Sequence, residues 1–188
     1  MLSPPDNRGN ALSAAGAGEP TTSPQPALSV QYAAAGDDLP ARPLLRRWVR
    51  AALGSEVAAT AIVLRFVEES ESRTLNRRYR NLDRPTNVLA FVYDGERRAG
   101  ADMLSGDIIL CAPVLRREAI SQGKPLPAHC AHLVVHGMLH LQGYQHDRAA
   151  GAAQMERREI EILARLGFGD PYVIGPGLPA KPVRRASR

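Results

Sequence analysis

The sequence predicts an α+β (mixed α/β) domain in which a small mixed four-stranded sheet packs with about five helices. Two patterns support this fold class: short β-branched segments alternate with segments of helical periodicity, and glycines follow several of the helical ones. Size is the third observation, because 188 residues of which 44% are hydrophobic suit one globular domain with a modest core.

The first half of the chain alternates strand and helix. Residues 27–34 (ALSVQYAA) and the β-branched 59–67 (ATAIVLRFV) are typical of strands. Between them, 43–53 has helical periodicity, and its expected inward side chains are Leu44, Leu45, Trp48 and Val49. Residues 71–81 have acidic side chains at the start and arginines towards the end, which matches the helix macrodipole and predicts a second helix.

The second half begins with two further short strands, 86–93 and 105–111. Asp107 is expected in a Gly-Asp-Ile turn into the latter strand, either as a turn residue or as hydrogen-bond support for a site. Three helices follow: 113–121 before Gly123, the apolar 127–141 before Gly143, and the amphipathic 147–166 before Gly167.

Both ends of the chain differ from this pattern. Residues 1–27 are rich in small residues and proline, and 173–188 form a basic tail, so both are predicted to be disordered around a folded domain at 28–172. No apolar run is long enough for a membrane span, and no signal peptide is recognisable at the N-terminus, so we expect a cytoplasmic protein without a membrane partner. Cys111 and Cys130 are too few for a disulfide scaffold and are expected to be buried.

Histidine is the most unevenly placed residue type, because all five histidines lie between positions 129 and 146. His136 and His140 are four apart on a predicted helix and therefore share a face. Gly143 can end that helix and let His146 return to the same ion. Three nitrogen ligands with a fourth position for water are typical of a catalytic zinc site. The spacing therefore predicts one Zn²⁺ per chain, bound by His136, His140 and His146.

The two earlier histidines allow a rival triple of His132, His136 and His140. His132 and His140 would lie about 12 Å apart along a helix axis, which makes a shared tetrahedral ion strained. We therefore expect His132 to take part in packing or to hydrogen-bond behind the ligands, and His129 to belong to the helix start. The alternative for His136, His140 and His146 is that they bind no metal.

The spacing of the three predicted ligands is also that of metzincin proteases, so a zincin-like metal site is expected on a central helix. The proteases place their general-base glutamate directly after the first histidine, and Gly137 stands there in this chain. Without that carboxylate the peptidase mechanism loses its proton acceptor. Phosphodiester cleavage fits better, because a metal ion and arginine can stabilise the charge that builds on phosphoryl oxygens.

A cluster of arginines supports phosphate chemistry. Its members lie around Asn76 and Tyr79 and are Arg73, Arg77, Arg78, Arg80 and Arg84. The guanidinium group matches phosphate through two parallel hydrogen bonds, and Tyr79 could stack on a base. The alternative is a solvated helix face that is balanced by neighbouring glutamates. Thr86 and Asn87 either anchor a loop or contact RNA.

Three segments of the chain form a recognisable set: 75–91 (LNRRYRNLDRPTNVLAF), 106–108 (GDI) and 136–146 (HGMLHLQGYQH). Read together, they closely resemble the YbeY family of bacterial endoribonucleases, also called rRNA maturation factors. Met155-Glu156, Glu159 and Asp170-Pro-Tyr172 fit the closing helix and exit of the family. The resemblance covers roughly residues 27–172. The chain departs from the family at Leu82, Ala90 and Gln145, where lysine, serine and aspartate are common.

The resemblance implies a metal-dependent endoribonuclease that cuts single-stranded RNA in rRNA processing, notably at the 3′ end of the small-subunit RNA, and that acts in ribosome quality control. Its implied partners are rRNA, the small ribosomal subunit and assembly factors, with no DNA expected. The resemblance assigns zinc to the three histidines and makes Arg80 the catalytic or phosphate-binding arginine. His136 and Arg80 are thus the expected catalytic residues. The attacking group, water or the 2′-hydroxyl of the RNA, is left open.

Two other classes of function remain as alternatives. One is a ribosome-assembly factor without catalysis, in which the zinc is structural. The other is a zinc peptidase of unusual type.

Overall fold

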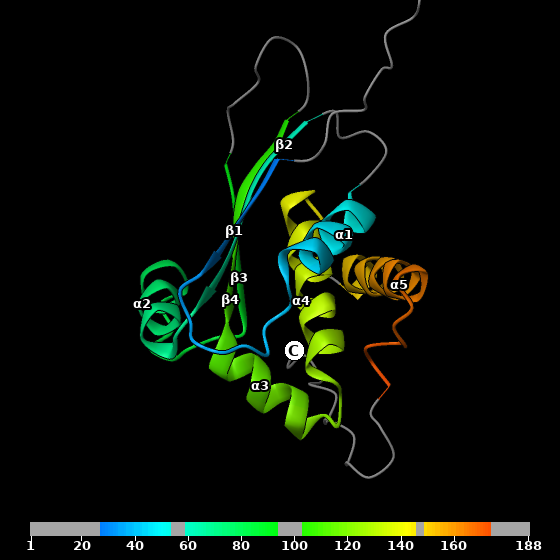
Figure 1. The fold of residues 1–188 in the computed structure, drawn as a ribbon. Helices are drawn as coiled ribbons and strands as arrows, with labels where there is room; N and C mark the ends of the chain where they lie inside the picture. The colour runs from blue at the N-terminus through cyan, green and yellow to red at the C-terminus, as the bar shows by residue number, and fades with distance from the viewer. Residues whose placement is uncertain (1–26, 54–58, 94–102, 146–148, 174–188) are drawn as a thin grey trace, which may run out of the picture.

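The computed structural model describes residues 27–53, 59–93, 103–145 and 149–173 (Figure 1). Its elements in chain order are β1 Ala27–Tyr32, α1 Arg42–Ala52, β2 Ala59–Val67, α2 Glu69–Arg80, β3 Val88–Val92, β4 Met103–Cys111, α3 Ala112–Ser121, α4 Leu126–Leu141 and α5 Ala149–Leu166. One sheet has the strand order β1-β2-β4-β3. β1 and β4 run parallel to β2, whereas β3 is antiparallel to β4. The predicted α+β fold, with a mixed four-stranded sheet and five helices, is confirmed for the described residues.

The sheet has helices on both faces (Figure 1). α4 lies along one face with α1 and α5 beyond it, and α2 covers the other. Alternate strand residues point to opposite faces. Ile62 and Ile108 therefore join the larger core under α4, whereas Ile109 joins a smaller cluster with Leu75 of α2. The larger core buries the only tryptophan, Trp48, and fixes α4 against the sheet.

Two glycines allow α4 to approach the sheet closely. A Cβ at Gly137 of α4 would lie 2.9 Å from Cγ2 of Ile108 on β4, which is too short for two carbon atoms. A Cβ at Gly106 of β4 would collide with the backbone oxygen of Phe91 and with Leu141 near the end of α4. Because side chains are absent at both positions, the helix rests directly on β4 beside β3.

Two local predictions are wrong. Leu44 is 42% exposed, because the buried stripe of α1 consists of positions 45, 48, 49 and 52, and residue 44 lies off that face. Asp107 lies inside β4 rather than in a turn, since β4 extends back to Met103 and pairs Asp107 with Phe91 of β3.

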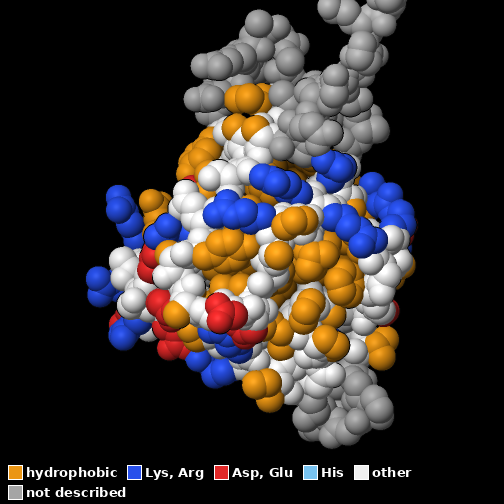
Figure 2. Space-filling view, in the orientation of Figure 1, with side chains coloured by type: hydrophobic (Ala, Val, Ile, Leu, Met, Phe, Trp, Pro, Cys, Tyr) orange, Lys and Arg blue, Asp and Glu red, His pale blue; other side chains and the backbone are white. Residues whose placement is uncertain are grey.

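The ends of the chain are only partly covered by the structure. The predicted disorder of 1–27 and 173–188 falls outside the described residues, apart from Ala27, which begins β1, and Val173. None of the described helices is both long and apolar enough to cross a membrane. On the face drawn in Figure 2, Lys and Arg side chains are spread among exposed apolar ones rather than gathered in one patch.

Candidate metal centre

The C-terminal half of α4 brings together two of the three histidines predicted as metal ligands. His136 and His140 are one helical turn apart, and their Nε2 atoms lie 3.1 Å from each other. Two imidazoles on one tetrahedral Zn²⁺ at 2.0–2.1 Å would place their nitrogens about 3.3 Å apart. The pair therefore fits a shared ion with little movement of either ring.

The third predicted ligand, His146, lies outside the described residues, as does Asp147. The chain before it turns as expected: α4 ends at Leu141, and Gly143 adopts φ +86°, the left-handed conformation that glycine tolerates best. The assignment of His146 stays a prediction, and so does the complete three-histidine site.

A buried carboxylate lies behind His136. Glu159 of α5 is 0% exposed, and its Oε1 accepts a 2.7 Å hydrogen bond from Nδ1 of His136. Its Oε2 accepts hydrogen bonds from Nε2 of His132, at 3.2 Å, and from the hydroxyl of Tyr172. Burial alone would raise the pKa of Glu159, but the bonds from His132, His136 and Tyr172 outweigh it and hold that pKa at about 2.

The same residues form a group that could hold a metal ion. His132, His136 and Glu159 each offer a ligand atom, and these atoms lie within 4.8 Å of one another. The chain thus has metal-ligating side chains at this place, although the identity of an ion does not follow from them. Two arrangements compete, because His136 can ligate through Nε2 beside His140 or through Nδ1 beside Glu159.

The two earlier histidines of α4 have partners outside the His136–His140 pair. His129 is 3% exposed, and its Nε2 donates a 2.9 Å hydrogen bond to Oε2 of Glu118 on α3. His132 reaches Glu159 instead, as described above. Nδ1 of each ring is buried without a hydrogen-bond partner among the described residues. His129 lies in the first turn of α4, as expected, and the hydrogen-bond role expected of His132 fits its contact with Glu159.

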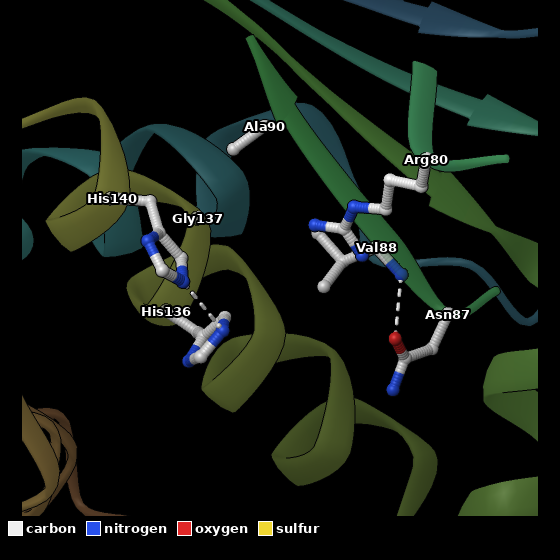
Figure 3. Close-up of a pocket in the computed structure, with 7 residues that line it drawn as sticks. All are labelled: Arg80, Asn87, Val88, Ala90, His136, Gly137 and His140. Carbon is white, nitrogen blue, oxygen red and sulfur yellow. Dashed lines mark hydrogen bonds between the residues drawn. The ribbon is translucent and has the colours of Figure 1, made fainter. Parts of the chain in front are cut away.

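A cavity of about 350 Å³ opens beside the His136–His140 pair. It is lined by Arg80, Asn87, Val88, Ala90, His136, Gly137 and His140 (Figure 3). The histidines come from α4, whereas the guanidinium of Arg80 reaches in from the end of α2. The fold therefore puts the predicted catalytic arginine and two predicted ligands on one cavity, although Arg80 and His136 are 56 residues apart in sequence.

Local structure fixes the direction in which Arg80 leaves α2. Asn81 ends the helix in the left-handed conformation, with φ 57°. Nδ2 of the buried Asn76 donates a 2.7 Å hydrogen bond to the backbone oxygen of Arg84, which ties down the loop after the helix. Arg80 therefore stands at the last helical position before a turn with defined geometry.

The other members of the arginine cluster are not all directed at the cavity. Arg73 makes two hydrogen bonds with Asp83, at 2.8 and 2.7 Å. Arg78 lies over the ring of Tyr79, which packs edge-on against Phe91 with ring centroids 4.8 Å apart. Tyr79 nevertheless remains 55% exposed. Among the five arginines, only Arg80 lines the cavity described here.

Asn87 and Asp107 both serve the protein scaffold. Asn87 accepts a 2.7 Å hydrogen bond from the backbone N–H of Val88 and donates one to Glu118, so it anchors the loop before β3. Asp107 accepts a 2.6 Å hydrogen bond from the hydroxyl of Tyr93, and this bond raises the pKa of Tyr93 to about 12. Of the positions that depart from the family pattern, Ala90 lines the cavity, and Leu82 and Gln145 are exposed.

The position of the protease glutamate has no room for a side chain. Gly137 packs on Ile108, so even an alanine Cβ would be too close to β4. The close packing therefore gives a structural reason for a glycine between His136 and His140. This reason is separate from the missing general base.

Glu159 is the site residue whose role the sequence reasoning missed. A signal was present, because Glu159 occupies an inward position of α5 together with Met155, Ile162 and Leu166. A carboxylate in an apolar helical stripe needs a buried partner, and histidine is the residue type that this chain concentrates elsewhere. The partner itself could not be read from spacing.

Comparisons with known proteins show which family this sequence is similar to. A family model described as endoribonuclease YbeY matches residues 37–167. Endoribonuclease YbeY of Nitrosomonas europaea is 51% identical over 147 residues, which is 78% of this chain and 85% of that protein. The protein of the same name from Thiobacillus denitrificans is 50% identical over 149 residues, or 79% of this chain and 97% of that protein.

A solved structure supports the fold. The solution structure of TM1509 from Thermotoga maritima matches with a TM-score of 0.50 and 22% identity, over 74% of this chain and 91% of that one. The family match covers more than half of the chain, and the identities hold over most of its length. The resemblance predicted from the three motifs is confirmed, and the chain belongs to the YbeY family of endoribonucleases.

Proposed function

We propose that this chain is a zinc-dependent endoribonuclease that cuts single-stranded RNA in rRNA processing, including maturation of the 3′ end of the small-subunit RNA and ribosome quality control. The observation that carries the proposal is the shared cavity of Arg80, His136 and His140. The substrate rests on the family, whose name states endoribonuclease activity. In this proposal the protein acts in the cytoplasm with the small ribosomal subunit and assembly factors as partners.

The residues of the cavity divide the work between binding and charge stabilisation. His136, His140 and His146 would hold the zinc ion, which when bound supplies Lewis-acid chemistry at a phosphate or a water. Arg80 would pair with the phosphoryl oxygens, because its planar group offers two parallel N–H donors. Its guanidinium enters the cavity from α2, opposite the histidines of α4, so a phosphate between them would contact both (Figure 3).

The absence of a carboxylate after His136 argues against a peptidase. A glutamate there would place its Cβ 2.9 Å from Cγ2 of Ile108, which would force the packing between α4 and β4 to shift. Among the described residues that line the cavity, none is acidic, and an anionic phosphate is therefore not repelled.

The decisive experiment combines metal analysis with RNA cleavage. Purified protein is quantified for zinc and incubated with a labelled single-stranded rRNA precursor, a duplex of the same sequence and casein. We expect one zinc per chain and cleavage of the single strand alone. Zinc-loaded protein that binds but never cuts the RNA would instead support an assembly factor, and cleavage of casein without RNA cleavage would support a peptidase.

The products also identify the attacking group. A 2′,3′-cyclic phosphate or a 3′-phosphate on the upstream product indicates attack by the 2′-hydroxyl of the RNA. A 5′-phosphate on the downstream product indicates attack by water.

A further inference from the structure

Among the described residues, Glu159 is the one acidic side chain that is buried. It is fully buried, and three side chains donate to its two oxygens: His136, His132 and Tyr172. The donors come from two segments: His132 and His136 lie on successive turns of α4, and Tyr172 follows α5. An ionised carboxylate at this place can accept all three hydrogen bonds, which compensate for its burial.

An ionised carboxylate has no proton to donate, and this determines the state of His136. The hydrogen in the 2.7 Å contact must sit on Nδ1 of His136. In a neutral imidazole the other nitrogen, Nε2, then carries a lone pair. That Nε2 points toward Nε2 of His140, 3.1 Å away, where a metal ion would need it.

The competing arrangement makes Glu159 itself a ligand, together with His132 and His136. Oxygen and nitrogen ligands on one tetrahedral zinc lie roughly 3.3 Å apart. The Oε1–Nδ1 separation of 2.7 Å is much shorter, and is ordinary for a charge-assisted hydrogen bond. Glu159 therefore fits better behind the ligand than on the ion.

Tyr172 extends this arrangement beyond α5. Gly167 reverses the chain after α5 with φ +88°, and the backbone N–H of Tyr172 bonds to Oδ1 of Asp170 at 2.8 Å. The ring of Tyr172 then packs edge-on against His132, with centroids 5.6 Å apart, while its hydroxyl reaches Oε2 of Glu159. His132 and Tyr172 thus donate to Oε2 of Glu159, while Oε1 accepts the hydrogen bond from His136.

We propose that Glu159 is a positioning residue, which fixes the tautomer and direction of His136 for metal binding and is itself held by His132 and Tyr172. This inference rests on the proposed metal site, since it concerns the histidine expected to bind zinc. It assigns Glu159 and His132 to hydrogen bonding behind the ligand and not to the ion.

The first test uses metal-free protein, so its outcome does not depend on RNA cleavage. ¹⁵N NMR of labelled histidines should find His136 with its proton on Nδ1 in the wild type. Glu159→Gln presents an amide that donates from one end, which conflicts with the donors around it. We expect a mixture of His136 tautomers in this variant. An unchanged spectrum for His136 would overturn the proposal even if the enzyme cuts RNA as expected.

The second test measures zinc affinity by competition with a chelator. Glu159→Gln should weaken binding by roughly 10–100-fold, the usual effect of losing a hydrogen-bond partner of a ligand. Glu161→Gln, an exposed change of the same chemistry on the same helix, should leave the affinity unchanged. Equal affinities for the two variants would contradict the positioning role.

Two further variants separate positioning from ligation and guard against misfolding. His132→Phe should retain one zinc per chain. Complete loss of zinc in this variant would show that His132 is a ligand and would overturn the assignment. Tyr172→Phe removes one donor but leaves the His136 contact, so we expect a weaker loss of affinity than in Glu159→Gln. No loss at all in Tyr172→Phe would remove Tyr172 from the proposal, and this variant tests the network even if Glu159→Gln does not fold.

Discussion

Two histidine–carboxylate contacts on the same helix have opposite consequences. His129 and His136 are seven residues, or two turns, apart on α4, and each hydrogen-bonds to a glutamate from another helix. His129 uses Nε2, the tip of its ring, and is sealed in the protein at 3% exposure. His136 uses Nδ1, near the backbone, and its side chain keeps 25% exposure with Nε2 directed to His140.

The difference teaches that the ring nitrogen in contact with the carboxylate decides what a histidine can do. A carboxylate at the tip uses the atom that could reach a ligand and leaves a structural link. A carboxylate at the base fixes the ring and leaves the tip for chemistry. Neither residue type nor distance from the glutamate separates the two cases.

The largest expected effect is on zinc binding, and it tests directly whether His129 and the His136–His140 pair have different roles. His140→Ala should lose zinc almost completely, by more than the roughly 100-fold limit typical of changes behind a ligand. His129→Ala should retain zinc and instead lower the free energy of unfolding by about 1–3 kcal/mol, because the hydrogen bond of the buried ring to Glu118 is lost. Metal analysis and urea unfolding of both variants test this. Zinc loss in His129→Ala would mean that the comparison is wrong.

Two arginines on α2 allow a similar comparison on the other side of the cavity, because Arg80 lines it and Arg73 does not. Arg80→Gln should reduce RNA cleavage by about 100–1,000-fold with zinc retained, if its guanidinium stabilises the phosphoryl charge. Arg73→Gln removes the same charge from an exposed residue that is paired with Asp83, and should have little effect. Initial rates at matched zinc content give the result, and equal losses would indicate a general charge effect instead.

The contact that sets the histidines against the sheet can be tested through stability. Gly137→Ala should lower the free energy of unfolding by about 1–2 kcal/mol: overpacking against Ile108 costs about 1–3, and better helix propensity returns up to about 1. The double variant Gly137→Ala/Ile108→Ala should be less destabilised than the sum of its single changes. Strict additivity in urea unfolding would argue against the contact.

The smallest expected effect is on the reactivity of two buried thiols, Cys130 of α4 and Cys111 of β4. Burial raises the pKa of Cys130 to about 12 and also raises that of Cys111. A raised thiol pKa means that little thiolate exists until the pH approaches that value, so at pH 8 both thiols should react slowly with DTNB in the native protein. Denaturant should expose both. Rapid labelling of Cys130 in the folded state would contradict the closed environment beside His129.

Much of the fold was predictable because its signals are local. The strand at 59–67 and the end of α4 at Leu141 follow from β-branched residues and from Gly143, which act within a few positions. Two predictions were wrong: Asp107 was expected in a turn before β4, and Leu44 was expected on the side of α1 that faces the core. Both depend on packing: β4 pairs with β2 back to Met103, and contact with α4 and α5 selects one stripe of α1.

The candidate site divides in the same way. By itself the sequence determined that His136 and His140 share a helical face, that a glycine turn follows them, and that Gly137 stands where a protease has its base. Only the tertiary structure decided that Arg80 enters the same cavity, that Glu159 binds Nδ1 of His136, and that Ile108 excludes a side chain at position 137. The physical reason is range: helical spacing is fixed by backbone hydrogen bonds a few residues apart, whereas these three contacts join elements that meet only when the core packs.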